Sequence, residues 1–280
     1  MTRGQGEGPL SLELSFDWSP AGALPQLARH LRARPDGEAL RHAVDRAPPA
    51  LHPIARRCWE ARVRSEYVGV MLCRKLHGLL VDLNAPLDLQ ELALLMTLQE
   101  QQHSALCADA LAAIGGERWV PCPLDELQQV RQGSPEEELG ELLWGTFLVG
   151  EFVALELLRE SIQTLPSSPF RDILREIARD EVLHGRLALE LLPVARAGGF
   201  ESWFPYPGDE ELRRIIERFR EGLRRRDVIE EEALVASEEP AHQAALAALG
   251  LSEPRGFLTR YRSAIDERLP AALAAVGFSL

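Results

Sequence analysis

The chain has 280 residues and a formal net charge of −12, which allows a sizeable core and argues against broad affinity for nucleic acid or anionic membranes. Aromatic residues make up only 6% of the chain, whereas Ala, Leu, Glu and Arg abound, and these side chains lose least freedom in a helix. We therefore predict an all-α protein.

The first predicted part, residues 1–52, is an N-terminal arm. Two short helices are expected in it, near residues 23–33 and 36–46, and Pro48 and Pro49 close it. The first 20 residues contain no apolar segment of the kind that directs export. No catalytic motif is visible in this part.

The second predicted part, residues 53–197, begins with a helical hairpin. Its helices are expected at about 53–82 and 88–114, and Asn84 and Pro86 lie at the turn between them.

A second hairpin of similar size follows a connector at residues 115–133. Ser134 is the predicted N-cap of a helix that runs to about residue 165. Residues 166–169 turn the chain, and a fourth helix continues to about residue 192, where Pro193 and then Gly198 and Gly199 are expected to end it.

The third helix contains an apolar stretch, residues 142–158, that is nearly long enough to span a bilayer. Two glutamates interrupt it, and carboxylates are rare and costly inside membranes. A buried carboxylate is acceptable in a soluble core when a cation neutralises it. We predict a core helix and no membrane span.

The third predicted part, residues 198–280, starts with a loop rich in aromatic residues and proline. Three or four amphipathic helices follow. We expect this part to form a C-terminal extension packed on the two hairpins, and its helices could also provide the surface of a homodimer.

The cysteines indicate a reducing compartment. The chain has four, with no CxxC pair and no zinc-ribbon spacing, and a chain of this length does not need disulfide bonds for stability. Together with the N-terminal sequence, this favours the cytoplasm. The cysteines are Cys58, Cys73, Cys107 and Cys122.

Each hairpin carries a single glutamate on its first helix and a Glu-x-x-His motif on its second helix. These residues are Glu66, Glu100 and His103 in the first hairpin and Glu151, Glu181 and His184 in the second. In each hairpin the glutamate and the motif are almost equally distant from the turn. Because helix rise is constant, all of them are predicted to lie at one level.

Four carboxylates and two imidazoles at one level of a core could not stay buried and ionised without a cation. A glutamate from each of two helices and a Glu-x-x-His motif from each of two others is the ligand set of di-iron carboxylate helix bundles. Carboxylates bridge divalent ions, and imidazole nitrogen suits iron. The sequence therefore predicts a centre of two iron ions, with a Mn/Fe pair left open.

This pattern resembles the ferritin-like di-iron carboxylate superfamily over roughly residues 54–195. The stretch IARDEVLH, residues 177–184, is most similar to the ligand helix of the ribonucleotide reductase small subunit. The resemblance implies a ferritin-like four-helix bundle, and it implies that Asp180 hydrogen-bonds the ring of His103 as part of the catalytic machinery. Cys107 stands where that family has its radical tyrosine, and Ile177 where arylamine N-oxygenases have a third histidine.

We therefore expect a non-haem di-iron oxygenase or oxidase that uses O2 to hydroxylate, desaturate or N-oxygenate a small organic substrate, with a reductase or ferredoxin as electron donor. One alternative is iron oxidation or peroxide scavenging, as in ferritins and rubrerythrins. Another is a metal-free helical scaffold or binding protein.

Other acids and one other histidine compete for these roles. Glu60 competes with Glu66, although nearby arginines suit it to a surface ion pair, and Arg62 offers Glu66 an ordinary ion pair too. Glu156 competes with Glu151 but points to a different face. A third Glu-x-x-His spacing, Glu239 to His242, has no matching partner and is interpreted as chance.

Overall fold

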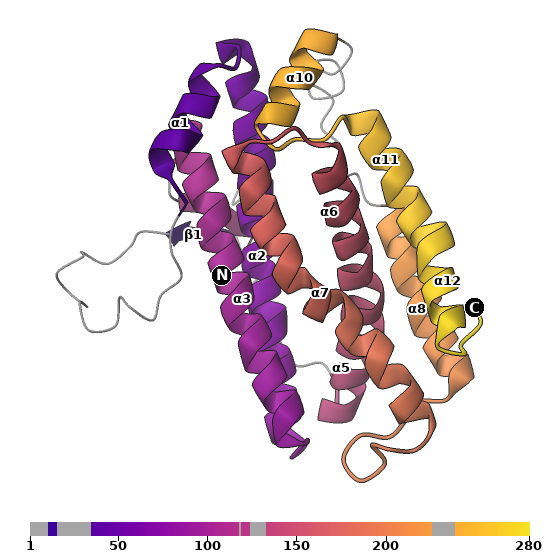
Figure 1. Ribbon diagram of the computed structural model, residues 1–280. Helices are drawn as coiled ribbons and strands as arrows, with labels where there is room; N and C mark the ends of the chain where they lie inside the picture. The colour runs from indigo at the N-terminus through magenta and orange to yellow at the C-terminus, as the bar shows by residue number, and fades with distance from the viewer. Residues whose placement is uncertain (1–10, 16–34, 118, 124–132, 226–238) are drawn as a thin grey trace, which may run out of the picture.

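The computed structural model describes residues 11–15, 35–117, 119–123, 133–225 and 239–280. Within these ranges the protein is predominantly helical, as predicted (Figure 1). The predicted helix at 36–46 is α1, Gly37–Asp45, and η2, Pro49–Leu51, follows it. The predicted helix at 23–33 lies outside the described residues.

One small sheet was not predicted. Strand β1, Ser11–Ser15, pairs in antiparallel fashion with β2, Trp119–Pro123, so that Leu14 lies opposite Val120. The two strands are more than 100 residues apart, and a pairing between such distant segments leaves no local pattern in the sequence. This sheet fastens the start of the described chain to the connector between the two hairpins.

The first predicted hairpin is confirmed. Helix α2, His52–Asp82, and helix α3, Leu87–Ala113, lie against each other along most of their length (Figure 1). Asn84 takes the left-handed backbone conformation between them, at φ 51°, which asparagine tolerates better than most residues. The tight turn makes the two helices antiparallel.

The second hairpin is also confirmed, with a difference in its first helix. Ser134 caps α5, Pro135–Glu141, through a reciprocal capping box with Glu137. The chain then continues as a π-helix, η3, Leu142–Glu151, before α6, Phe152–Thr164, completes the run. Sequence periodicity predicted one uninterrupted α-helix here. Segments of π-helix are rare and occur frequently at functional sites.

The fourth helix runs a few residues past its predicted end at about residue 192. Helix α7 runs from Pro169 to Arg196 and includes Pro193 in its last turn. Proline removes a single N–H and strains one preceding carbonyl, a cost that the packed end of a long helix can absorb. The two predicted glycines follow the last helical turn: Gly198 has a φ of 78°, and Gly199 donates to the Val194 carbonyl oxygen.

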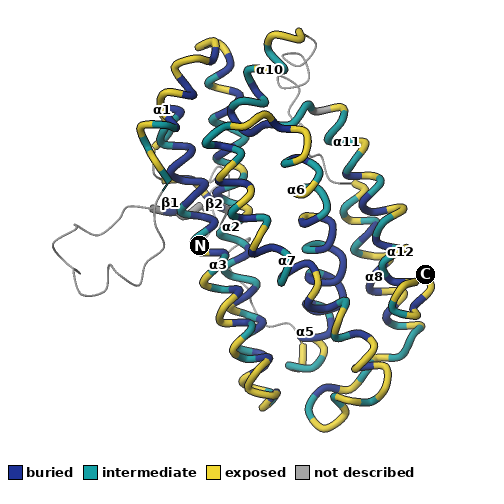
Figure 2. The backbone as a smooth tube through the Cα atoms, in the orientation of Figure 1, coloured by how far each residue is buried: buried dark blue, intermediate teal, exposed yellow. Residues whose placement is uncertain are grey.

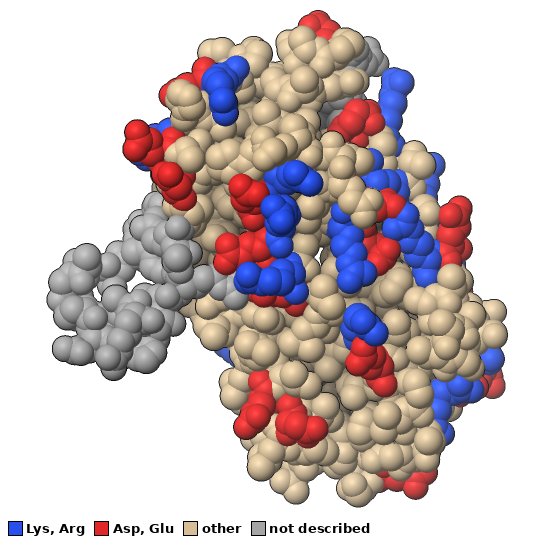
Figure 3. Space-filling model, in the orientation of Figure 1, with Lys and Arg blue, Asp and Glu red and all other residues tan. Residues whose placement is uncertain are grey.

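The C-terminal helices flank the second hairpin. Helix α8, Asp209–Arg225, packs against η3, and α11, Pro254–Ser263, packs against α6 (Figure 1). The remaining elements are α10, Pro240–Ala248, η4, Ala264–Arg268, and α12, Leu269–Ala275. Acidic and basic side chains are interleaved on the face shown in Figure 3.

The buried faces of the long helices point inward (Figure 2). They form two large apolar clusters, one around Trp144 and Phe147 and the other around Trp59 and Phe170. No helix in the described part of the chain is both long enough and apolar enough to cross a membrane. The stretch at 142–158 is a core segment, as predicted.

We expect Gly145→Ala to weaken the packing of α8 on η3. A Cβ atom at Gly145 would lie 2.2 Å from the Phe219 ring, whereas one at Gly150, in the same segment, would meet no atom within 4 Å. Overpacking of this kind costs about 1–3 kcal/mol. Denaturant unfolding should show that loss for Gly145→Ala, while Gly150→Ala leaves the free energy of unfolding unchanged or raises it by up to about 1 kcal/mol. Equal effects for the two variants would contradict this packing.

Candidate metal centre

The structure brings together all six metal ligands predicted from the sequence. Glu66, Glu100, His103 and Glu181 offer ligand atoms that lie within 4.8 Å of one another, and so do Glu100, Glu151, Glu181 and His184. The residues come from α2, α3, the end of η3, and α7. Two four-residue groups therefore overlap, and both contain Glu100 and Glu181.

The cluster lies between the two apolar core clusters. The side chains of His103 and His184 are fully buried, those of Glu100 and Glu181 are 4% and 7% exposed, and that of Glu66 is 19% exposed. Such burial is unfavourable for bare carboxylates. Divalent cations or protons must therefore neutralise the cluster.

The Nδ1 atoms of both histidines point among the carboxylates. His103 Nδ1 lies 3.2 Å from Glu181 Oε1 and 3.4 Å from Glu66 Oε2, and His184 Nδ1 lies 2.8 Å from Glu100 Oε1. Neither nitrogen meets any of these oxygens in hydrogen-bond geometry, and Glu181 Oε2 is also without a hydrogen bond. Buried donor and acceptor atoms are rarely left in this state. The donor set and its orphaned atoms fit metal ions, which would accept all three atoms as ligands.

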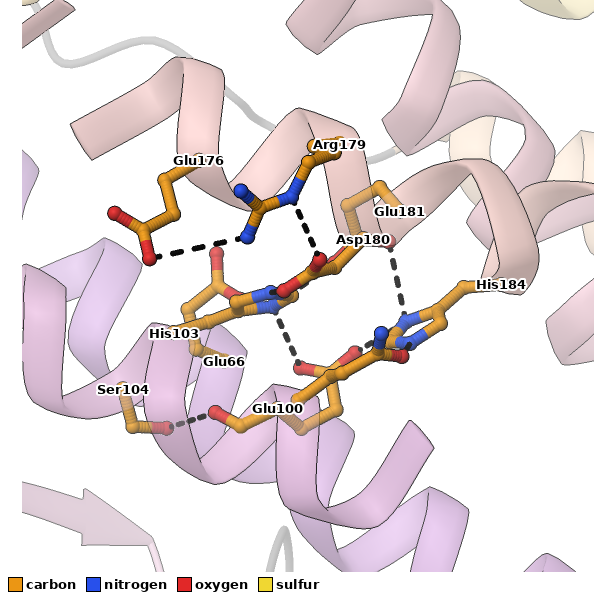
Figure 4. Close-up of polar contacts among 10 residues, drawn as sticks. Glu66, Glu100, His103, Ser104, Glu176, Arg179, Asp180, Glu181 and His184 are labelled. Carbon is orange, nitrogen blue, oxygen red and sulfur yellow. Dashed lines mark hydrogen bonds and ion pairs between the residues drawn. The ribbon is translucent and has the colours of Figure 1, made fainter. Parts of the chain in front are cut away.

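The other nitrogen of each imidazole is held by a side chain from the opposite hairpin. His103 Nε2 lies 3.4 Å from Asp180 Oδ2 (Figure 4). His184 Nε2 lies 3.0 Å from Gln99 Oε1. An Nε2–H donated to these oxygens leaves Nδ1 as the lone-pair atom that faces the carboxylates. Asp180 thus occupies the place that the resemblance implied.

Gln99 was missed in the sequence. A signal for it exists, because Asp180 directly precedes Glu181, and Gln99 directly precedes Glu100. Each of these residues orients the histidine of the other motif. Each Glu-x-x-His motif is therefore preceded by a polar residue, and that residue contacts the histidine of the other motif.

Two glycines allow the helices to approach closely around the site. A Cβ atom on Gly69 would lie 2.3 Å from Glu100 Oε2, and one on Gly185 would lie 3.0 Å from the Glu151 carbonyl oxygen. Both positions are buried or half-buried within long helices, where glycine is otherwise unfavourable. Their absent side chains leave the space that the Glu100 carboxylate and the η3 backbone occupy.

The metal-free cluster retains protons. Burial lowers the pKa of His184, but contacts with Glu100 and Glu181 outweigh it and raise the pKa to about 10. In the same way, Asp180, Glu181 and Glu66 overcome burial and raise the pKa of His103 to about 12. Burial raises the pKa of Glu100 to about 7 and that of Glu151 well above its usual range.

Two cysteines lie close enough to the cluster for its charges to act on their thiols. Burial raises the pKa of both thiols well above the usual value, and the charges of Glu100, Glu151 and Glu181 act on Cys73. Those of Glu66 and Glu100 act on Cys107. Cys73 belongs to one apolar core cluster and Cys107 to the other. Both are free, buried thiols.

The competing residues lie elsewhere. Glu156 accepts a hydrogen bond from Arg159 at 3.1 Å and another from Arg268 at 2.9 Å. Glu239 is 71% exposed and lies 3.5 Å from His242 on the same helix. Glu60 belongs to neither four-residue group. The structure thus favours Glu66 over Glu60 and Glu151 over Glu156.

No protein-family model matches the chain, and no match is found among curated proteins or solved structures. The function must therefore be inferred from the geometry of the site.

We expect Gly69→Ala to lower the metal affinity of the site. The new methyl group would displace the Glu100 carboxylate, whereas a Cβ atom at Gly78, farther along α2, would meet no atom within 4 Å. A loss of roughly 10–100-fold in affinity is typical when a metal ligand loses its support. Competition with a chelator of known affinity measures it. An unchanged affinity in Gly69→Ala, or an equal loss in Gly78→Ala, would count against the role of Glu100.

We also expect metal binding to release protons. Both histidines carry raised pKa values, His184 to about 10, so at pH 7 a metal must displace their protons to reach the ring nitrogens. Raising the pH removes those protons, and affinity should therefore rise roughly tenfold per pH unit for each proton displaced between pH 6 and 8. Calorimetry in buffers of different ionisation enthalpy counts the protons. Glu156→Gln is the control, and an affinity independent of pH would overturn the expectation.

Proposed function

We propose that this protein is a non-haem di-iron oxygenase or oxidase that uses O2 to oxidise a small organic substrate. The observation that carries the proposal is the overlap of the two four-residue groups, which share the carboxylates of Glu100 and Glu181. A shared carboxylate can contribute one oxygen to each of two ions. This arrangement favours a dinuclear centre over two unrelated mononuclear sites.

In this proposal the fold is a ferritin-like four-helix bundle. Two antiparallel helical hairpins, with ligands on all four helical runs, support that assignment. Glu66 and His103 would hold one ion, Glu151 and His184 the other, and Glu100 and Glu181 would lie between them. Iron is the preferred metal because the set mixes hard carboxylates with imidazole, and a Mn/Fe pair satisfies the same ligands.

The protein's own groups would orient and shield the centre. Asp180 and Gln99 hold the imidazole rings so that both Nδ1 atoms face the metals. Apolar side chains above and below exclude water from the carboxylates. Two ferrous ions would supply electrons and open positions for reducing O2. A reductase or ferredoxin would return the electrons that this chemistry consumes.

Cys107 favours substrate oxidation over ribonucleotide reduction. This thiol occupies the position of the radical tyrosine in the family that the α7 sequence most resembles, and it is fully buried. The orphaned histidine nitrogens, in turn, count against a metal-free scaffold, because a scaffold has no use for buried atoms without partners.

Anaerobic loading with ferrous iron tests the proposal. We expect two irons per chain, and subsequent exposure to O2 should consume O2 and produce ferric absorption in the near ultraviolet. Glu100→Ala and Glu181→Ala should each retain less than one iron, because each removes an oxygen from both metal positions. Glu156→Ala, whose carboxylate is paired with Arg159 and Arg268, is the matched control and should retain two.

Other outcomes select the alternatives. A hollow assembly that accumulates many irons per chain would indicate iron storage. Rapid peroxide removal without oxidation of any organic substrate would indicate scavenging. Purified protein without iron or manganese, whose stability is unchanged in Glu100→Ala and Glu181→Ala, would indicate a scaffold.

A further inference from the structure

Arg62, one turn from a predicted ligand of the metal centre, forms no ion pair with the carboxylates of the described residues, although the charge of Glu66 acts on it. Arg62 lies one helical turn before Glu66 on α2, and therefore on the same face of that helix. Its Cζ atom lies 4.6 Å from the centre of the Trp59 ring, and Nη1 donates to the Gly250 carbonyl oxygen at 3.1 Å. The sequence suggested an ion pair with Glu66. The guanidinium instead packs on an indole and a backbone carbonyl.

Most of the hydrogen-bonding capacity of Arg62 remains open. A guanidinium has five N–H donors, and within the described residues only the bond to Gly250 uses one of them. The half-buried side chain has no nitrogen that is both sealed from solvent and unpaired. The remaining N–H groups therefore face space that solvent can reach, although burial lowers the pKa of Arg62.

Glu66, one helical turn from Arg62, lies at a partly accessible edge of the metal centre. Glu66 is 19% exposed, whereas Glu100, Glu181 and both histidines are at most 7% exposed. The charges of Arg62 and Glu66 both act on the Cys107 thiol. The open donors of Arg62, the thiol and Glu66 are thus neighbours on one side of the cluster.

We propose that Arg62 anchors a carboxylate group of the substrate beside the Glu66 edge of the metal centre. The inference rests on the proposed function and names its substrate class, a small organic molecule with one carboxylate. The acid end binds the guanidinium, and the remainder of the molecule lies along the apolar surface toward the metals.

A carboxylate suits this place better than a phosphate. Its two oxygens match the paired N–H groups of a guanidinium, and one negative charge balances one arginine. A phosphate dianion would meet a single cation beside four glutamates and would be repelled more strongly. Bound divalent ions reduce that repulsion, so metal loading should strengthen carboxylate binding.

The C-terminal extension holds Arg62 in position. Trp59 Nε1 donates to the Leu249 carbonyl oxygen at 3.0 Å, next to the bond between Arg62 and Gly250. Gly250 has a φ of 77°, and a Cβ atom there would lie 3.0 Å from Phe170 and 3.2 Å from Trp59. Only glycine fits this turn easily. Consecutive carbonyls of the turn thus fix both the indole and the guanidinium.

Calorimetric titration of the full chain tests the anchor, with acetate, benzoate and octanoate as probes and benzamide as the neutral counterpart of benzoate. Zinc-loaded protein supplies divalent charge without redox chemistry, and metal-free protein is titrated in parallel. At least one monocarboxylate should bind, benzamide should bind at least tenfold more weakly than benzoate, and zinc should strengthen carboxylate binding.

Variants assign the binding to Arg62. Arg62→Met should weaken carboxylate binding at least tenfold. Arg62→Lys keeps the charge but not the paired donors, so its carboxylate affinity should lie between those of Arg62→Met and the natural protein. Arg64→Met is the matched control, because Arg64 lies on the same helix and donates to the Pro121 carbonyl oxygen. It should remain within twofold. If Arg62→Met does not fold, carboxylate binding to Arg62→Lys and the comparison of benzoate with benzamide decide the test.

Any of three results would overturn the anchor. The first is that none of the carboxylates binds at concentrations up to about 10 mM, which would already be a weak affinity. The second is that benzoate and benzamide bind equally, and the third is that the Arg62 variants bind carboxylates as tightly as the natural protein. These results are separate from the iron test. A chain that holds two irons but binds carboxylates without Arg62 contradicts the anchor alone. A chain that binds benzoate through Arg62 but takes up no iron contradicts the proposed function alone.

Discussion

The burial of four carboxylates and two imidazoles at one level of the helical core is the constraint around which this protein is organised. Contacts with carboxylates raise the pKa values of both histidines, and burial raises those of Glu100 and Glu151, so the cluster retains protons when no metal is bound. Protons balance the charge but leave the two Nδ1 atoms without hydrogen bonds. Metal ions would satisfy charge and geometry together.

The surrounding helices are shaped to this cluster. Gly69 removes a side chain where α2 approaches the Glu100 carboxylate, and Gly185 does the same where α7 approaches the end of η3. The π-helical segment ends at Glu151, which lies with the other ligands. A straight α-helix would present a different set of side chains to the core over the same length. Local irregularity thus supports a regular ligand arrangement.

The sequence predicted the ligands because it encodes them through two simple regularities, constant helix rise and turns marked by Asn84 and by the Pro-Ser-Ser-Pro stretch at 166–169. Features that depend on contacts between distant segments were not predictable in this way. The pairing of β1 with β2 is one example, and the bond from Arg62 to Gly250, across 188 positions, is another. The end of α7 was misjudged because Pro193 is a strong local signal that tertiary packing overrode.

The centre is not symmetric. The histidine that has a carboxylate partner and the partly exposed Glu66 lie on the same side of it. Asp180, a carboxylate, contacts His103, whereas Gln99, a neutral amide, contacts His184. A carboxylate partner makes an imidazole a stronger donor to a metal than an amide partner does. A metal held by His103 and Glu66 would therefore be the more electron-rich of the two. Glu66 is 19% exposed, and Arg62 lies one turn away from it. Under the proposed function, the partly accessible Glu66 edge is also the edge where a carboxylate partner of the imidazole would add electron density to a metal.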